Sequence, residues 1–138
     1  MFGQTRSPVA AYAQVGVETA VQTASPHELI ALLFEAGRSA IRMARLAMEQ
    51  GQVDVRGTTI SKAIDIISNG LQVSLDLDNG GDLASKLSAL YSYMTRRLVY
   101  ANIHDDRQAL DEVDNLLGEI QEAWIEIGHK VQQPSTVD

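Results

Sequence analysis

The stretch from Ser25 to Gln50, SPHELIALLFEAGRSAIRMARLAMEQ, decides the fold class. It opens with serine, proline and, three residues after the serine, glutamate, a combination typical of a capping box at a helix N-terminus. Its apolar residues recur at intervals of four and three, as on one face of an α-helix, and Gly51 supplies a stop. The stretch therefore predicts a long amphipathic helix.

The rest of the chain predicts three more helices of similar length. No proline lies between residues 27 and 133, and Gly80-Gly81 and the segment 102–106 mark the remaining breaks. The predicted helices cover about residues 54–78, 82–104 and 106–130, with N-caps at Asp82 and Asp105. Because the connections are only a few residues long, neighbouring helices should be antiparallel.

These elements predict an all-α fold, an antiparallel up-down four-helix bundle over residues 25–131. We expect residues 1–24 to form a short, mobile N-terminal helical segment and residues 132–138 to form a disordered tail. Trp124 lies on the apolar seam of the last helix, so we expect it in the core.

Composition narrows the functional classes. Eleven Lys and Arg against 18 Asp and Glu give a net charge of −7, which argues against binding to nucleic acid or to anionic membranes. There is no cysteine, and no apolar run approaches the ~20 residues of a membrane-spanning helix. The N-terminus lacks the pattern of a secretory signal. We expect a cytoplasmic protein without membrane insertion.

Catalytic and metal-binding motifs are weak. A di-metal bundle needs two Glu-x-x-His motifs, and residues 126–129 supply the only one, with Glu126 on the polar side of its helix. We therefore predict no metal, no cofactor and no catalytic residue, and hence a protein that is not an enzyme. A helical-bundle metal or small-ligand carrier or enzyme stays open as the alternative, which metal analysis of the purified protein would test.

Two features point to a partner protein. The second and third predicted helices are apolar on more than one side, so each is either central in the bundle or keeps a groove for another segment. The N-terminal segment contains Tyr12 and Val15, which either belong to a frayed terminus or dock onto such a groove. The sequence leaves both alternatives open.

Several motifs, in order along the chain, resemble those of the FliS family of flagellar secretion chaperones. The match runs from about Ala11 to Lys130 and includes an N-terminal tyrosine segment, the start of the first long helix and the paired arginines of the third. The motifs are Ala11-Tyr12-Ala13-Gln14-Val15, Thr23 to Ile30, Leu33 to Ala36, Lys62 to Ile67, Asn69 to Leu71, Gly80 to Asp82, Leu90 to Met94, Arg96 to Leu98, Ala101-Asn102 and Glu112 to Trp124.

The resemblance implies an export chaperone. Members of the family bind the disordered C-terminal tail of flagellin in the cytoplasm, prevent its premature polymerisation and deliver it to the export gate of the flagellar type III apparatus. The flagellar anti-sigma factor or a flagellin-regulating protein is a further candidate partner by the same resemblance. In the family, the N-terminal tyrosine segment covers part of the binding groove when it is empty.

The partner-binding residues are predicted from this resemblance and from the apolar stripes of the second and third helices. Gly70 would let the partner backbone approach closely, and the two asparagines would bond its open backbone groups. The predicted set is Tyr12, Val15, Ile60, Ala63, Ile67, Asn69, Gly70, Leu71, Tyr91, Met94, Arg97, Leu98 and Asn102.

Overall fold

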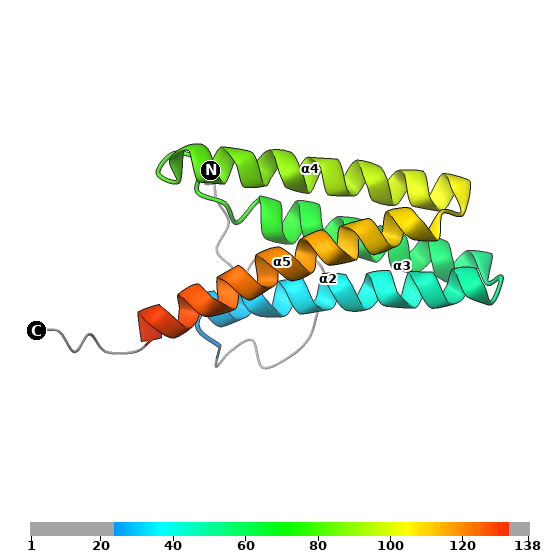
Figure 1. Ribbon diagram of the computed structural model, residues 1–138, viewed down its shortest axis with the longest axis horizontal. Helices are drawn as coiled ribbons and strands as arrows, with labels where there is room; N and C mark the ends of the chain where they lie inside the picture. The colour runs from blue at the N-terminus through cyan, green and yellow to red at the C-terminus, as the bar shows by residue number, and fades with distance from the viewer. Residues whose placement is uncertain (1–23, 133–138) are drawn as a thin grey trace, which may run out of the picture.

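A computed structural model of the chain describes residues 24–132, except for the side chains of residues 129–132. Within this region four α-helices follow one another, and successive helices run in opposite directions (Figure 1). The elements are α2 (Pro26–Glu49), α3 (Val53–Ile66), the π-helix η2 (Ile67–Gln72), α4 (Gly81–His104) and α5 (Arg107–Gln132). The predicted all-α fold with four antiparallel helices is confirmed.

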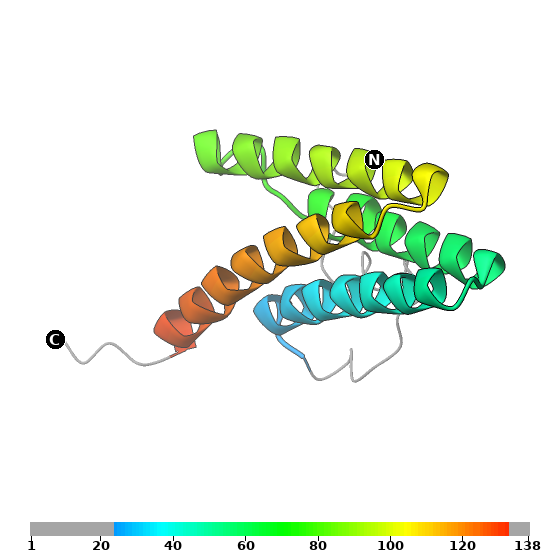
Figure 2. The ribbon, with the colours of Figure 1, turned by 45° about the vertical axis from the view of Figure 1, so that its right-hand side comes forward.

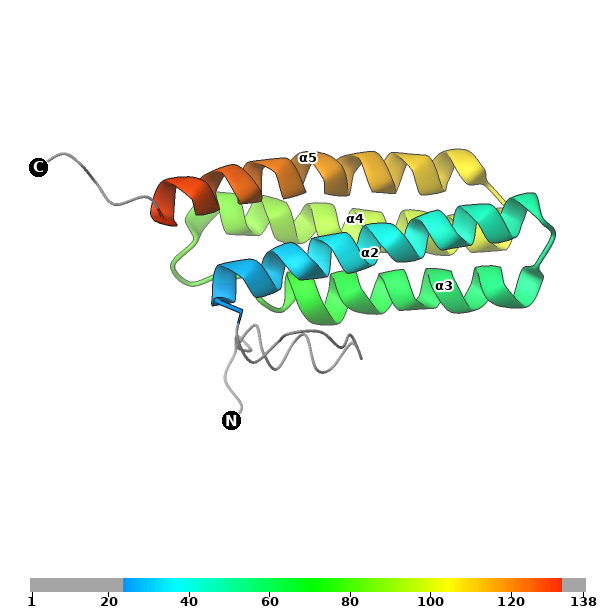
Figure 3. The same ribbon diagram turned by 90° about the horizontal axis from the view of Figure 1, so that it is seen from below.

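The four helices pack around one core. α2 contacts α3 and α5, and α4 contacts α5, η2 and α3, so α2 and α4 occupy opposite corners of the bundle (Figure 3). All four helices contribute apolar side chains to a single buried cluster, as one domain core requires. The largest fully buried side chains are Phe34, Leu29, Leu33, Ile60, Ile66, Ile67, Met94, Leu98, Leu110, Leu117 and Val113.

The start of α2 agrees with the prediction. The hydroxyl of Ser25 accepts a hydrogen bond from the backbone N–H of Glu28 (3.1 Å), and the Glu28 carboxylate accepts one from the Ser25 N–H (2.8 Å). This is the reciprocal capping box, and both bonds satisfy donors that the helix itself cannot pair. At the other end Gly51 adopts φ 70°, so the glycine stop is also confirmed.

The second helix differs from the prediction. Regular α-helix ends at Ile66, the chain continues as η2 to Gln72, and the expected extension to residue 78 was wrong. The hydroxyl of Ser74 donates to the carbonyl of Gly70 (2.7 Å), and Asp76 accepts from the backbone N–H of Asn79 (3.1 Å). Short polar side chains that bond nearby backbone favour turns over helix, which is the signal that apolar spacing alone missed.

Both predicted N-caps were placed on the wrong residue. Asp82 lies inside the first turn of α4, whose N-cap is Gly80. Asp105 ends α4 in the left-handed conformation (φ 55°), a region that aspartate tolerates better than most residues. Asp106 then caps α5, because its carboxylate accepts from the backbone N–H groups of Gln108 (2.9 Å) and Ala109 (3.3 Å).

A buried glycine in α2 offers a test of the packing. A Cβ added to Gly37 would lie 3.4 Å from Cγ2 of Ile66 and 3.8 Å from Cδ1 of Leu117, which is ordinary van der Waals contact. Because alanine is a better helix residue than glycine, we expect Gly37→Ala to raise the free energy of unfolding by up to about 1 kcal/mol. Urea denaturation measures the change, with Gly37→Leu as an overpacked control that should be less stable. A less stable alanine variant would mean that the α2–α3 packing is tighter than described.

Candidate partner-binding surface

One apolar stripe of α4 passes from the core to the surface. Leu98 and Met94 are fully buried, Leu90 and Leu87 are half-buried, and Leu83 is 67% exposed. These residues are spaced by three or four and so share one face of the helix. The change in exposure therefore reflects what covers that face along its length.

α5 shows the same change in the reverse direction. Val113 and Leu117 are fully buried, Ile120 is half-buried, Ala123 is exposed and Ile127 is 50% exposed. The two helices are antiparallel, and they diverge toward the start of α4 and the end of α5 (Figures 1 and 2). Both apolar stripes are thus uncovered at the same end of the bundle.

We call this region the α4–α5 apolar surface. Its residues are Leu83, Leu87, Leu90, Ile120, Ala123 and Ile127. Apolar area on two adjacent helices is unfavourable in water by about 25 cal/mol per Å², and such patches typically mark binding sites. A partner that inserts apolar side chains here would recover that free energy.

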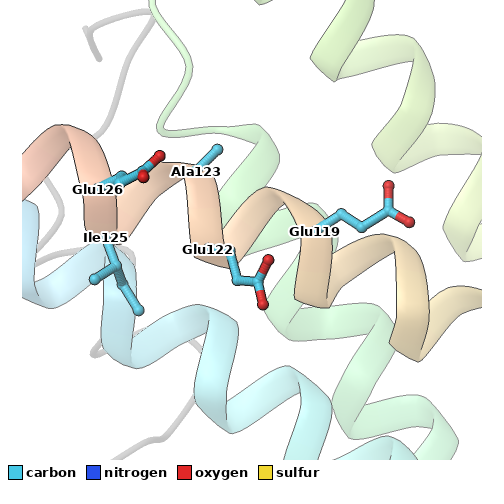
Figure 4. A pocket seen from close by; sticks show the side chains of 5 residues that line it. All are labelled: Glu119, Glu122, Ala123, Ile125 and Glu126. Atoms are coloured by element: carbon cyan, nitrogen blue, oxygen red, sulfur yellow. The ribbon is translucent and has the colours of Figure 1, made fainter.

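Acidic side chains lie beside this surface on α5. Figure 4 shows Glu119, Glu122 and Glu126 projecting from the helix around Ala123 and Ile125, and these five residues line a shallow depression. A partner segment with basic or neutral groups flanking its apolar residues would therefore be electrostatically favoured here.

The predicted apolar partner-binding residues come together in the structure, but as core. Seven of the eight are members of the single buried cluster, and Gly70 is buried within η2. The eight buried residues are Ile60, Ala63, Ile67, Gly70, Leu71, Tyr91, Met94 and Leu98. In this conformation they line no open surface, so Gly70→Leu would first report on core packing.

The three polar residues of the predicted set lie closer to solvent and have intramolecular partners. Asn69 donates to Asp65 (2.6 Å), and Asn102 accepts from Nε of Arg56 (3.0 Å). Tyr12 and Val15 fall outside the described residues. A contact between any residue of the predicted set and a partner remains a prediction.

Arg97 belongs to a network that joins α4 to α5. Its Nε donates to Glu112 (2.8 Å), and the hydroxyl of Tyr93 donates to the other oxygen of that carboxylate (2.5 Å). The hydrogen bonds from Tyr93 and Arg97 lower the pKa of Glu112 below its ordinary 4.5, and the Tyr93 pKa is raised by the same contact with Glu112. In this structure Arg97 is thus bonded to a carboxylate of α5.

This network predicts a pH dependence. A carboxylate whose pKa is lower in the folded state stabilises the fold above its ordinary pKa, and that contribution is lost as the pH falls through the lowered value. We expect Glu112→Gln to be less stable than wild type at pH 7 and the difference to shrink steadily below pH 4.5. Urea denaturation of both proteins from pH 3 to 7 measures this, and a difference that is constant with pH would assign no such role to Glu112.

The end of η2 is tied to α4 by a contact that the sequence did not indicate. The side-chain amide of Gln72 donates to the Ser88 carbonyl (3.0 Å), the Ser88 hydroxyl (3.1 Å) and the Ser92 hydroxyl (2.9 Å). Because these acceptors lie one turn apart on α4, one glutamine holds η2 against the helix that carries part of the α4–α5 apolar surface. Only the tertiary pairing of the two elements reveals this contact.

The part of the chain that the structure describes contains neither a candidate membrane-spanning helix nor a candidate metal site. No helix there is long and apolar enough to cross a membrane. Among the described side chains, no three His, Asp or Glu residues gather as a metal site would require.

Comparison with known proteins identifies relatives that match most of the chain. The family model "Flagellar protein FliS" matches residues 8–131. The flagellar secretion chaperone FliS of Salmonella typhimurium is 53% identical over 126 residues, which are 91% of this chain and 93% of that protein. The Escherichia coli protein of the same name is 47% identical over 116 residues, 84% of this chain and 85% of its own length. That of Bacillus subtilis is 33% identical over 119 residues, 86% and 84% of the two chains.

The resemblance drawn from the sequence motifs is therefore confirmed. It does not depend on one conserved segment, since the matched residues include all four helices that the structure describes. The exposed α4–α5 apolar surface is the kind of feature that a protein whose work is to hold another chain requires. The chain belongs to the FliS family of flagellar secretion chaperones.

Proposed function

We propose that this protein binds the disordered C-terminal tail of flagellin in the bacterial cytoplasm, keeps flagellin from polymerising early and delivers it to the flagellar export gate. Membership of a family of flagellar secretion chaperones supports a flagellar protein as the partner. The observation that carries the proposal is the α4–α5 apolar surface, where two helices present uncovered apolar stripes at the end of the bundle at which they diverge.

The geometry favours an unfolded partner over a folded one. A segment that forms amphipathic helical turns on binding can place apolar side chains between the diverging ends of α4 and α5. Ordering such a segment offsets about 2–5 kcal/mol of the contact energy, so tight binding requires an extended interface. The anti-sigma factor or a flagellin-regulating protein remains a candidate further partner. No described contact favours the metal or small-ligand alternative.

The first test addresses the partner. We expect the protein to co-purify from cells with full-length flagellin and not with flagellin that lacks its C-terminal tail. Retention of the truncated flagellin would contradict the proposal that the C-terminal tail is the segment that the protein binds. Failure to retain either form would contradict flagellin as the partner.

The second test addresses the surface. We expect the double variant Leu83→Ser/Ile127→Ser to bind the flagellin tail peptide about tenfold more weakly or worse in calorimetric titration, because truncating well-placed apolar contacts removes much of the binding energy. Both side chains are at least half exposed, so folding should be little affected. Wild type and peptide together should also gain helicity over the separate components.

A matched control lies on the outer side of α2. Met43 (54% exposed) and Leu46 (52% exposed) are as apolar and as exposed, but they are far along α2 from the diverging ends of α4 and α5. Met43→Ser/Leu46→Ser should bind the tail like wild type. Equal weakening by both double variants would show that the α4–α5 apolar surface is not the specific site.

A further inference from the structure

The four helices differ in charge, and α4 stands apart. It carries three cationic side chains, Lys86, Arg96 and Arg97, against the single carboxylate of Asp82. By contrast, α2 is balanced, α3 with η2 is balanced, and α5 carries six carboxylates against two cations. In a protein with a net charge of −7, α4 is therefore the one described helix with net positive charge.

The outer side of α4 also carries apolar residues near its C-terminal end. Val99 is 46%, Tyr100 40% and Ile103 70% exposed. Together with Arg96 they follow the spacing i, i+3, i+4 and i+7, which places all four on one face. That face points away from the buried Leu98 and Ala101, so it is separate from the α4–α5 apolar surface.

The Tyr100 ring on this face contacts a cationic and an aromatic side chain of the same helix. The guanidinium of Arg97 lies 4.8 Å from the centre of the Tyr100 ring, and the ring of His104 lies 4.2 Å from it on the same helix. Among the residues that the structure describes, Arg97 pairs with Glu112, whereas Arg96 forms no ion pair. One unmatched cation thus lies beside three exposed apolar side chains.

A hollow extends the surface onto α3. It lies between the start of α3 and the end of α4, and its lining includes Val53, Gly57 and Asn102. Asn102 is three residues after Val99, so the hollow adjoins the outer face of α4. A side chain from a segment lying along α4 would find a recess there.

We propose that the face formed by Arg96, Val99, Tyr100 and Ile103 docks an acidic amphipathic helix of a second protein, separately from the segment bound at the α4–α5 apolar surface. Two turns of α4 present the apolar stripe, which matches two turns of a partner helix with apolar residues at three- and four-residue spacing. Carboxylates flanking that stripe would pair with Arg96, in contrast to the acidic surroundings of the α4–α5 apolar surface.

The test uses a helical peptide of about 18 residues with leucines at three- and four-residue spacing and glutamates beside them, and a matched peptide in which lysine replaces every glutamate. We expect the full chain to bind the glutamate peptide in a salt-dependent manner and the lysine peptide much more weakly. Arg96→Glu and Ile103→Ser should each weaken binding of the glutamate peptide about tenfold. Lys86→Glu, the same charge reversal about 15 Å away along α4, should change it less than twofold.

Four results would overturn the proposal. They are no binding of the glutamate peptide, equal binding of the lysine peptide, equal effects of Arg96→Glu and Lys86→Glu, and competition by the flagellin tail for the same face. Light scattering of the protein alone tests whether a second copy of this chain occupies the face. If wild type self-associates and Arg96→Glu abolishes this, the occupant is the acidic outer side of α5 in another copy and not a different protein.

Discussion

Replacing Phe34 with alanine should lower the free energy of unfolding by about 3–5 kcal/mol. Phe34 is 1% exposed and is among the largest fully buried side chains of the described core. Its removal loses the transfer free energy of the ring and leaves a cavity that the four surrounding helices cannot fill without moving. A loss of this size is a large fraction of the 5–15 kcal/mol by which domains are typically stable.

Urea denaturation at pH 7 measures the change, and Phe34→Leu is the control. Leucine keeps most of the apolar volume, so its loss should stay below about 1.5 kcal/mol. A loss below about 1 kcal/mol for the alanine variant would contradict the position of Phe34 at the centre of the core.

Replacing Trp124 with alanine should cost about 2–3 kcal/mol, which is less than the ~3–5 kcal/mol of a fully buried tryptophan. The sequence predicted a core residue, and the structure shows a half-buried one that packs against the core. Its ring stacks on the imidazole of His27 at 4.3 Å, nearly parallel, and its Nε1 donates to the His27 carbonyl (3.0 Å). These contacts hold the last turns of α5 against the start of α2.

Trp124→Phe separates the contribution of ring stacking from that of the Nε1 hydrogen bond. It keeps an aromatic ring for stacking and removes the N–H donor, so we expect a loss of about 1 kcal/mol. Gly128 leaves room for this arrangement, because a Cβ there would collide with the His27 imidazole. An unchanged stability of Trp124→Ala would mean that the end of α5 is not held by this contact.

The contact between Trp124 and His27 bears on the proposed function. It holds α5 toward α2 at the end of the bundle where α5 and α4 diverge (Figure 2). Because Trp124 lies next to Ala123 on α5, Trp124→Ala can be compared with Leu83→Ser/Ile127→Ser for its effect on binding of the flagellin tail.

Much of the fold followed from local sequence. Ser25 and Glu28 specified the start of α2, and Gly51 its end, because capping bonds and left-handed glycine turns depend on residues adjacent in the chain. Apolar spacing predicted four helices, and their short connections made them antiparallel. The family motifs, read from the same sequence, predicted the relatives that comparison then identified.

The exact ends of the other helices could not be predicted from local sequence. Asp105 and Asp106 are both good capping residues, and only the left-handed conformation of Asp105, with its bond to Arg56 of α3, makes Asp106 the cap of α5. After Gln72 the local bonds of Ser74 and Asp76 favour a turn, and the amide of Gln72 ties the end of η2 to α4. Choices between adjacent, chemically similar residues are decided by contacts between helices, which apolar spacing does not contain.

The candidate surface was decided by tertiary structure alone. Leu83 and Leu98 lie on one continuous stripe of α4, and nothing in their spacing tells which is core and which is exposed. The predicted groove residues on the second and third helices combined family resemblance with apolar spacing, and the structure shows the apolar ones as buried. An apolar stripe predicts only that some part of that helix face will be buried. Arg97 joins α4 to α5 through Glu112 where the two helices pack together, and Trp124 joins α5 to α2 through His27 where α4 and α5 diverge. The packing of the helices therefore decides which part of each stripe remains open.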